Sequence, residues 1–594
     1  PPPAPASCFD NPLTATHCEA DATLSLPVRL GPRTELYDVS FEGNRELDEQ
    51  SLMDASELEL GKPANMLELE NARRRILDAY AEEGFAFADV AVALDLSPDQ
   101  QKGRARFTVS ERARVRVSEI VIRGAERTSE ALIRRRFALA PGKIYRRRYV
   151  RATEERLATL GVFSSITVEL EDPHIPARDK RVIVTVVERP TQYVEARPGF
   201  STGEGFRVGF EYGHRNIASE AIGFTLRLHL GYLPSPMILE RDVRKKFDEL
   251  SLAERLERNV TARFAFPEVG LGPLFPATLE LIDVRDNARD FGLTRDASIG
   301  TLIFRPRRNL STQISASLER NDATIFGNDA KGALRDYVEA HPTYRNIFRV
   351  PEGASLAVAE RLAVTWDRRD DPLGAKRGTY VSASAEHVHA TPLDGAAAGG
   401  SDIFSPTNSD FLRLDQRIAG YLPVSHHGSS IALSLGFGLN TQLQAGSRTY
   451  PDRLFFLGGV DSLRGFLQDS LVPEDVAAQL LNPSSNLTLR QVVIRGGDLY
   501  INPRLELRTP INGSLTMGWF IDSGNLWARP DRFNPLQLRY AVGTGLRIGT
   551  PIGPLAFDYG FNVDRLGHEL GLGSLRRYRY WEDLGAFHFS VGLF

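Results

Sequence analysis

Alternation of apolar and polar residues with period two runs through most of residues 193–594, and this pattern restricts the fold more than any other feature of the chain. Phe206, Val208 and Phe210, for example, alternate with arginine, glycine and glutamate. Such spacing is typical of β-strands that have one face in an apolar environment. Sixteen segments of this kind can be counted, near residues 193–201, 205–213, 220–232, 259–267, 277–288, 294–306, 309–321, 355–366, 377–389, 410–421, 429–440, 498–509, 512–522, 537–549, 553–562 and 586–594.

The number, length and connections of these segments favour a closed membrane barrel over a soluble sandwich. Sixteen is an even number, and many segments reach the roughly 9–11 residues that a tilted strand needs to cross hydrocarbon. Connections on one side are short, as at 509–512 and 550–552, whereas several on the other side are long. The long connections are 233–258, 322–354, 390–409, 441–497 and 563–585. Because a sandwich does not require this sorting, we expect a 16-stranded antiparallel transmembrane β-barrel over 193–594.

The composition excludes several other classes of protein. No run of 18 or more uncharged apolar residues occurs, which argues against membrane-spanning helices. The formal net charge is −4 with 25% charged residues, so the overall charge does not indicate a nucleic-acid partner. The sequence has no nucleophile motif of the Gly-x-Ser-x-Gly type, and His426 and His427 stand without metal-ligand spacing. We therefore expect no enzymatic activity, no cofactor and no metal.

Residues 35–190 form two copies of one α+β unit, which makes an internal repeat. The first unit, 35–114, begins with an alternating strand, continues with two helical stretches and ends with strands near 88–96 and 105–110. Gly84, directly after the second helical stretch, predicts a glycine C-cap. The second unit, 115–192, repeats the order strand, helix, helix, strand, strand. The expected fold is therefore two small α+β domains in front of the barrel.

Residues 1–34 are rich in proline and small residues and are expected to form an extended leader. The chain has two cysteines, Cys8 and Cys18, and both lie in this leader. A disulfide between them would close a short loop and fits an oxidising compartment such as the periplasm. Two unrelated free thiols remain the alternative.

Short motifs in both regions resemble those of one protein family. In the repeated units they are VSFEGN at 39–44, YAEEGF at 80–85 and LGVF at 160–163. In the barrel they are WDRRDDPL at 366–373, FFLGG at 455–459 with SLRGF at 462–466, FIDSGN at 520–525 and PIGPL at 551–555. Together the motifs resemble the outer-membrane protein assembly factors with POTRA domains, the family of BamA and TamA. Phe594 resembles the C-terminal signal of outer-membrane barrels, and the chain is closest in type to TamA or to a short BamA.

The resemblance implies a role for the motif Leu463-Arg464-Gly465-Phe466. In the family this motif lies on the sixth extracellular loop and folds back into the lumen, and the strand count independently places it in the sixth long-side connection. A guanidinium in a barrel lumen needs a carboxylate partner, and the resemblance names Asp522. Such a pair would fix the loop and brace the wall, which is a structural rather than a catalytic role. An exposed arginine without a partner is the alternative.

The expected first strand of the barrel contains Pro198 and Gly199. Proline cannot donate to the β-ladder and glycine packs poorly, so this strand should pair weakly along part of its length. If it meets the last strand, which ends at Phe594, the seam could open and template an incoming client strand by β-augmentation. An ordinary closed seam is the alternative.

The repeated units offer further strand edges. We expect strands 88–96 and 181–188 to accept extended client segments or partner strands, and the alternative is that the units are only spacers. The helical, charged stretch 239–258 is expected to form an extracellular cap or partner site.

The resemblance implies a factor that receives clients through POTRA domains in the periplasm and inserts or translocates them, autotransporters included, at a weak seam of an outer-membrane barrel. The implied partners are unfolded outer-membrane proteins, outer-membrane lipids and, through the POTRA domains, periplasmic chaperones, accessory lipoproteins or an inner-membrane-anchored protein. Two alternatives are a two-partner secretion pore that exports a large adhesin and a plain channel. The channel does not account for the repeats or for the inward-folded loop. Two POTRA domains are few for the BamA branch, which normally has five, and for the TamA branch, which has three.

Overall fold

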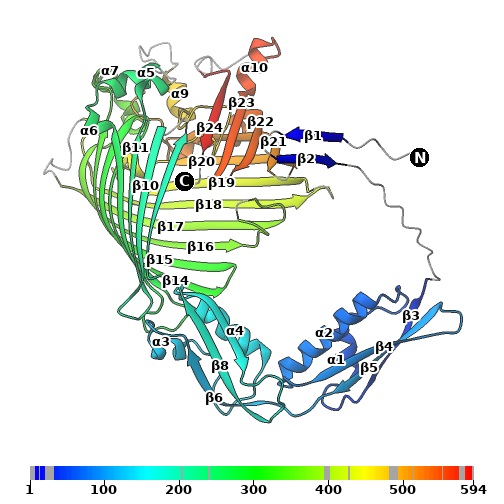
Figure 1. Ribbon diagram of the computed structural model, residues 1–594. Helices are drawn as coiled ribbons and strands as arrows, with labels where there is room; N and C mark the ends of the chain where they lie inside the picture. Colours follow the sequence, from blue (N-terminus) through cyan, green and yellow to red (C-terminus); the bar gives the residue numbers. More distant parts are fainter. Residues whose placement is uncertain are drawn as a thin grey trace. The chain divides into compact units, whose positions relative to one another are not determined.

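The computed structural model contains a closed barrel of sixteen antiparallel strands within the residues that it describes (Figure 1). The strands are β9 (Gln192–Ser201), β10 (Gly205–Ile217), β11 (Ile222–Tyr232), β12 (Leu256–Phe266), β13 (Ala277–Asn287), β14 (Phe291–Arg307), β15 (Leu310–Ile325), β16 (Gly353–Asp367), β17 (Gly378–Pro392), β18 (Ser409–Pro423), β19 (Ser430–Gln442), β20 (Leu499–Pro510), β21 (Leu515–Trp527), β22 (Arg539–Thr550), β23 (Gly553–Asn562) and β24 (Gly585–Val591). Each expected segment overlaps one of these strands, and the predicted fold class is confirmed.

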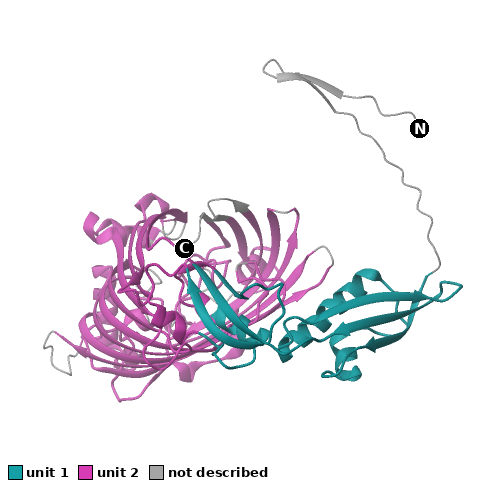
Figure 2. Ribbon diagram, turned by 60° about the horizontal axis from the view of Figure 1, so that its bottom comes forward, with its two compact units in different colours: residues 1–123, 137–155, 166–186 teal, residues 124–136, 156–165, 187–594 magenta. Residues whose placement is uncertain are grey.

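The structure describes residues 33–201, 205–238, 241–372, 374–393, 402–425, 428–480, 492–512, 514–550, 553–573 and 582–591, and only the backbone of 7–11 and 14–19. The chain divides into two compact units, which Figure 2 distinguishes by colour. One unit comprises 1–123, 137–155 and 166–186, and the other comprises 124–136, 156–165 and 187–594. Each unit has its own core.

The wall of the barrel shows why the sequence alternates. On β16, Leu356, Val358 and Leu362 are exposed on the outer face. Ala357 and Ala359, between them, are buried beneath the loop that follows β19. An apolar outer wall of this kind is stable only in contact with lipid, which satisfies the apolar face while the closed ladder satisfies the backbone.

Several strands extend further than their apolar pattern predicts, mainly on the side of the long loops, although β10 continues from 213 to Ile217 on the side of the short turns. β14 begins at Phe291 instead of 294, and β15 continues to Ile325 instead of 321. In the added part of β15 the outward residues are Asp322 and Thr324, which are polar. The β-ladder therefore continues beyond the level at which the wall needs an apolar face, and the hydropathy pattern ends before the strand does.

The long loops carry short helices, several of which share one apolar cluster above the barrel. The loop elements are η1 (Ser235–Met237), α5 (Arg241–Asp248), α6 (Leu252–Arg255), α7 (Asn328–Ala340), η2 (Pro342–Tyr344), α8 (Arg345–Phe348), η3 (Pro451–Arg453), α9 (Glu474–Leu480), η5 (Pro530–Arg532), η6 (Pro535–Gln537) and α10 (Val563–Glu569). Leu334, Phe348 and Val476 are buried together in the cluster. The stretch expected as a helical cap contains α5 and α6, although 239–240 lie outside the described residues. Within the described chain, no helix is long and apolar enough to cross a membrane.

The first α+β domain has the expected element order. It consists of β3 (Glu35–Glu42), α1 (Glu49–Ser56), α2 (Met66–Glu83), β4 (Asp89–Leu96) and β5 (Lys102–Ser110), with sheet order β3-β5-β4. Leu52, Ile76 and Phe107 are fully buried between helices and sheet. Gly84 ends α2 with a φ of 97°, so the predicted glycine cap is confirmed. β4 is an edge strand, as expected.

The second α+β domain repeats this plan, but one expectation about its edge is wrong. It consists of β6 (Arg116–Arg123), α3 (Glu130–Arg135), α4 (Arg147–Ala158), β7 (Phe163–Leu170) and β8 (Asp179–Glu188), with sheet order β6-β8-β7. The segment 181–188, expected to be an edge, belongs to the central strand β8. The last strand of the unit inserts between the other two and runs parallel to β6, so its backbone groups are already paired on both sides.

In the leader, β1 (Ser7–Asn11) and β2 (Thr14–Glu19) pair antiparallel with Cys8 opposite Cys18. The cysteine side chains lie outside what the structure describes, so the disulfide remains a prediction.

Candidate functional site

The connection between β19 and β20 folds back into the barrel and brings the motif 463–466 against the inner wall. Leu463 is fully buried and Phe466 is 4% exposed, and both belong to an apolar cluster with Leu526 of β21 and Ala541 of β22. Apolar burial therefore holds the loop against the wall independently of its charged contacts.

Arg464 occupies a pocket of carboxylates and is 1% exposed. Its Nε and Nη2 donate to Oδ2 and Oδ1 of Asp522 on β21 at 2.7 and 2.8 Å, which is a bidentate pair. Nη1 donates to Glu506 on β20 at 2.9 Å and lies 3.8 Å from Asp558 on β23. The guanidinium also lies 3.5 Å from the ring centroid of Phe520. The structure thus brings together the arginine and the aspartate that the sequence analysis singled out.

Gly465 allows the loop to approach the wall this closely. A Cβ at this position would lie 2.6 Å from Cβ of Ala541 and 3.1 Å from the carbonyl oxygen of Phe561. Gly560 of β23 plays the matching part on the wall, because its Cβ would lie 2.6 Å from the carbonyl of Arg464. Replacing either glycine by alanine would push the loop away from the strands.

The carboxylates around Arg464 hold three further arginines. Arg504 reaches Asp522 at 3.2 Å, Arg508 reaches Glu506 at 3.3 Å, and Arg547 reaches Asp558 at 2.8 Å. We name this set of four arginines and three carboxylates the lumen network. Because the carboxylates are shared, no single pair can be removed without changing the surroundings of another charge.

Sequence reasoning missed several partners of the loop. Glu506 and Asp558 face inward on their strands at positions whose parity matches that of Asp522, so the alternation could have indicated them. The Nε2 of His588 on β24 lies 3.2 Å from the carbonyl oxygen of Arg464, which connects the motif to the last strand. No short motif surrounds His588, and only its inward parity is a signal.

The seam between β24 and β9 is the least paired junction in the described barrel. It consists of two register pairs, Ser590 opposite Ser201 and Val591 opposite Phe200. The ring of Phe200 lies 6.1 Å from that of Phe589, a contact that crosses the seam. Pro198 and Gly199 directly precede Phe200 on β9 and pair in register with β10. Phe594, the third residue expected at the seam, lies outside the described residues.

Next to the seam, the lumen contains two adjoining recesses. One is lined by Arg197, Arg207, His229 and Asn259 from β9–β12, and its empty space, open lumen included, is about 880 Å³. The other shares Arg207 with it and reaches His588 on β24, and its empty space, open lumen included, is about 1100 Å³. The lumen is thus open beside β9–β12, whereas the motif fills it beside β20–β23.

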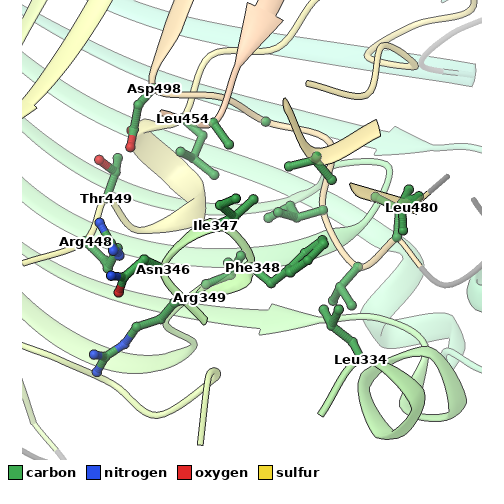
Figure 3. Close-up of a pocket in the computed structure, with 17 residues that line it drawn as sticks. Leu334, Asn346, Ile347, Phe348, Arg349, Arg448, Thr449, Leu454, Leu480 and Asp498 are labelled. Carbon is green, nitrogen blue, oxygen red and sulfur yellow. The ribbon is translucent and has the colours of Figure 1, made fainter. Parts of the chain in front are cut away.

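A further pocket lies in the loops above the barrel, between the α7–α8 loop and the connection that carries the motif (Figure 3). Asn346, Arg349 and Arg448 gather at its polar end and Phe348 lies near its centre. Burial raises the pKa of Asp498, another lining residue, to about 6, although the amide of Asn440 donates to its carboxylate at 3.1 Å. Among the described residues, no group of three histidine, cysteine or acidic side chains could hold a metal ion.

Comparison with protein families decides the classification. Residues 253–594, more than half of the chain, match the Omp85 superfamily domain. The chain belongs to the Omp85 superfamily. Residues 35–112 and 115–189 each match a POTRA domain, described as a surface antigen variable number repeat. The barrel of this Omp85 protein lies in the outer membrane and its POTRA domains lie in the periplasm, and the resemblance to the BamA and TamA family is confirmed.

Two curated relatives and one solved structure resemble most of this Omp85 chain. Outer membrane protein assembly factor BamA of Nitratidesulfovibrio vulgaris is 22% identical over 96% of the chain, and that of Neorickettsia risticii is 24% identical over 81%. The chain spans 63% and 57% of the lengths of these relatives. The crystal structure of BamA from Haemophilus ducreyi lacking POTRA domains 1–3 has a TM-score of 0.63 at 16% identity, covering 94% of this chain and 99% of that one, which shows a common fold.

Proposed function

We propose that this Omp85 protein inserts β-barrel clients into the outer membrane, receiving them on its POTRA domains and passing them to the seam between β9 and β24. The observation that carries the proposal is the seam itself. Among the described residues, it has two register pairs, whereas the β23–β24 and β9–β10 junctions have seven and ten. The curated relatives are named as assembly factors, which supports the same reading.

The seam suggests how insertion proceeds without an energy source. Among the described residues, Gln192 to Gly199 of β9 pair with β10 but with no residue of β24. The N–H and C=O groups of Gln192 to Ala196 that face away from β10 form an edge that an incoming strand can extend by antiparallel pairing. A client that forms this ladder exchanges hydrogen bonds to water for hydrogen bonds to β9, and its apolar face enters lipid.

The POTRA domains are proposed to hold clients before they reach the seam. β4 is an edge strand in the first domain and β7 is one in the second, so each sheet offers a free edge to an extended segment. Periplasmic chaperones, accessory lipoproteins or an inner-membrane-anchored protein would meet the same domains. Outer-membrane lipids contact the outer wall.

A two-partner secretion pore is the second candidate, and the presence of two POTRA domains favours it. The two functions differ in what crosses or enters the membrane. Depletion of the protein in its own organism, followed by quantitative profiling of the outer membrane, separates them. Broad loss of barrel proteins supports assembly, whereas loss of one large secreted protein supports secretion.

A seam lock tests the proposed mechanism directly. Ser201→Cys and Ser590→Cys, in a Cys8→Ser and Cys18→Ser background, place two thiols at one register pair of the seam. We expect the oxidised protein in liposomes to lose client insertion and the reduced protein to recover it. The matched control is Thr365→Cys with Ser382→Cys, a register pair between β16 and β17. Equal insertion by the oxidised and reduced seam variants would refute the mechanism.

A further inference from the structure

The geometry points to Arg453 as a second positioning residue, which fixes the inward-folded loop to β15 and β17 and thereby keeps the recess beside β9–β12 open for clients. The inference about clients rests on the proposed function. The inference about the position of the loop does not.

Arg453 ends the short helix η3 in the loop and is buried at 6% exposure. Its Nη2 donates to Glu319 of β15 at 2.7 Å, and its Nε lies 3.4 Å from Glu386 of β17. Nη1 donates to the neighbouring Asp452 at 2.7 Å. Three carboxylates surround this buried guanidinium, so it is held more strongly than the arginine of an exposed ion pair.

The acceptor Glu319 is itself positioned by the barrel wall. It is 1% exposed, and Arg295 of β14 donates to its other oxygen at 2.7 Å. The hydroxyl of Ser317, two residues earlier on the same inward face, donates to it at 2.7 Å as well. The amide of Asn321 donates to it at 3.3 Å, so three neighbours fix the carboxylate and the loop arginine completes its coordination.

A second contact at the same place is apolar and independent of charge. Tyr450, three residues before Arg453, is 4% exposed and packs with Ala359, Val388 and Phe411 on the inner faces of β16–β18. The first part of the loop, residues 443–453, which we call its first limb, is therefore attached to β15–β18 both by the burial of Tyr450 and by the ion pairs of Arg453.

Arg453 and Arg464 attach the loop to different sectors of the wall. The partners of Arg453 lie on β15 and β17, and those of Arg464 lie on β20, β21 and β23. Neither guanidinium forms a described contact with β9–β13, and the recess lined by Arg197, His229 and Asn259 lies on that side. Without the ion pairs of Arg453, the first limb is held to β15–β18 by fewer contacts and could turn about Arg464 toward this recess. With them, it is fixed away from the strands that border the seam on the β9 side.

The test uses the full-length protein in liposomes and compares Arg453→Met with Arg453→Lys. A cysteine at Asn259, in a Cys8→Ser and Cys18→Ser background, reports whether the recess is open through its rate of labelling by a polyethylene-glycol maleimide. We expect labelling to slow several-fold in Arg453→Met because the released limb enters the recess. General loosening of the barrel would instead accelerate labelling. Arg453→Lys keeps one ion pair, so its labelling rate should lie between those of the wild type and Arg453→Met.

Client insertion and a matched control complete the experiment. Insertion by Arg453→Met should fall about as far as labelling does, while the resistance of the unheated barrel to SDS stays unchanged. Arg335→Met removes a half-exposed arginine of the outer loops, whose partner is Asp402, and should change neither readout. Unchanged or faster labelling in Arg453→Met overturns the second anchor. Should wild type insert no client at all, the proposed function fails, and the labelling result still decides the anchor.

Discussion

At the scale of single residues, the lumen network has an imbalance of charge that decides which substitution harms it most. Four arginines face three carboxylates, so the network carries one net positive charge. Replacing Arg464 leaves three of each sign, whereas neutralising Asp522 leaves four arginines with two carboxylates. Both changes release the loop, but only the second adds uncompensated buried charge.

We therefore expect Asp522→Asn to destabilise the barrel more than Arg464→Met. The cost of an unpaired charge in a buried network is about 3–5 kcal/mol, and the loss in Arg464→Met should be smaller. Adding Arg464→Met to Asp522→Asn should recover part of the stability. The measurement is the temperature at which the folded band converts to the unfolded band on SDS gels. If Arg464→Met proves the more damaging, the charge argument is wrong and the contacts of the loop dominate.

Asp498, in the loop between β19 and β20, predicts a dependence on pH. Burial raises the pKa of Asp498 to about 6, so the folded loop binds the proton more tightly than the unfolded chain does. Stability of this loop is greatest below the ordinary aspartate pKa of about 3.9 and falls as the pH rises through about 6. Hydrogen exchange across 492–498 should be slower at pH 5 than at pH 7.5, after correction for the intrinsic rate.

Asp498→Asn is the control for that prediction. The amide is neutral at both pH values, so protection should no longer change between them. It should stay near the level of the wild type at pH 5. A pH dependence that persists in Asp498→Asn would assign the effect to another group of the loop.

Only part of the site could be predicted from the sequence. Arg464 and Asp522 stand in short motifs that resemble a known family, so both could be named in advance. Arg453 also lies near such a motif, but its partners Glu319 and Glu386 are far away in sequence on inward-facing strand positions. Strand parity shows that these carboxylates face the lumen and does not show which loop residue they meet. That pairing depends on how the loop folds.

At the scale of elements, the two POTRA domains share a device that the repeat did not reveal. In the first, Glu111 follows β5 and accepts the backbone N–H groups of Arg45 and Glu46 at 2.7 and 2.9 Å. In the second, Glu188 at the end of β8 accepts those of Arg127 and Thr128. Each carboxylate thus ties the last strand to the turn after the first strand.

Glu111→Gln should destabilise the first POTRA domain by about 1–3 kcal/mol, because Glu111 is buried and its carboxylate also accepts the hydroxyl of Tyr80. Burial raises the pKa of Glu111, but the hydrogen bonds outweigh burial and lower it overall. This stabilisation is present above the ordinary glutamate pKa and is lost as the pH falls through the lower, folded value. Glu188→Gln, at a half-exposed site, should cost less. Hydrogen exchange of each sheet in the full chain measures both effects, and equal effects would contradict the argument from burial.

Prediction of elements succeeded where one physical constraint acts along the whole element. Every barrel strand separates lipid from the lumen, so alternation locates all sixteen. It misses strand ends such as those of β14 and β15, where the strand continues past its apolar outer face. The order of strands within a sheet is not encoded in alternation. For that reason the segment 181–188 could be recognised as a strand but was wrongly expected at an edge.

At the scale of the whole molecule, different forces stabilise the two parts of the chain. Unit 1 contains a helix-on-sheet core around Leu52, Ile76 and Phe107, like that of a small water-soluble domain. The barrel depends on a closed ladder with an outer wall that lipid or detergent covers. Composition and alternation predicted this division, because only the C-terminal part lacks helical periodicity. Two structures with different stabilising forces should not unfold together.

We expect urea to unfold the detergent-solubilised protein in two steps. All four tryptophans lie between residues 366 and 581, so their fluorescence reports the barrel alone. The longest described helix, α2 (Met66–Glu83), belongs to unit 1, so the first loss of helical circular dichroism reports the POTRA region. That loss should occur at a lower urea concentration than the change in fluorescence. Glu111→Gln should shift only the first step and Asp522→Asn only the second. Coincident transitions, or a shift of both by one substitution, would show that the two units stabilise each other.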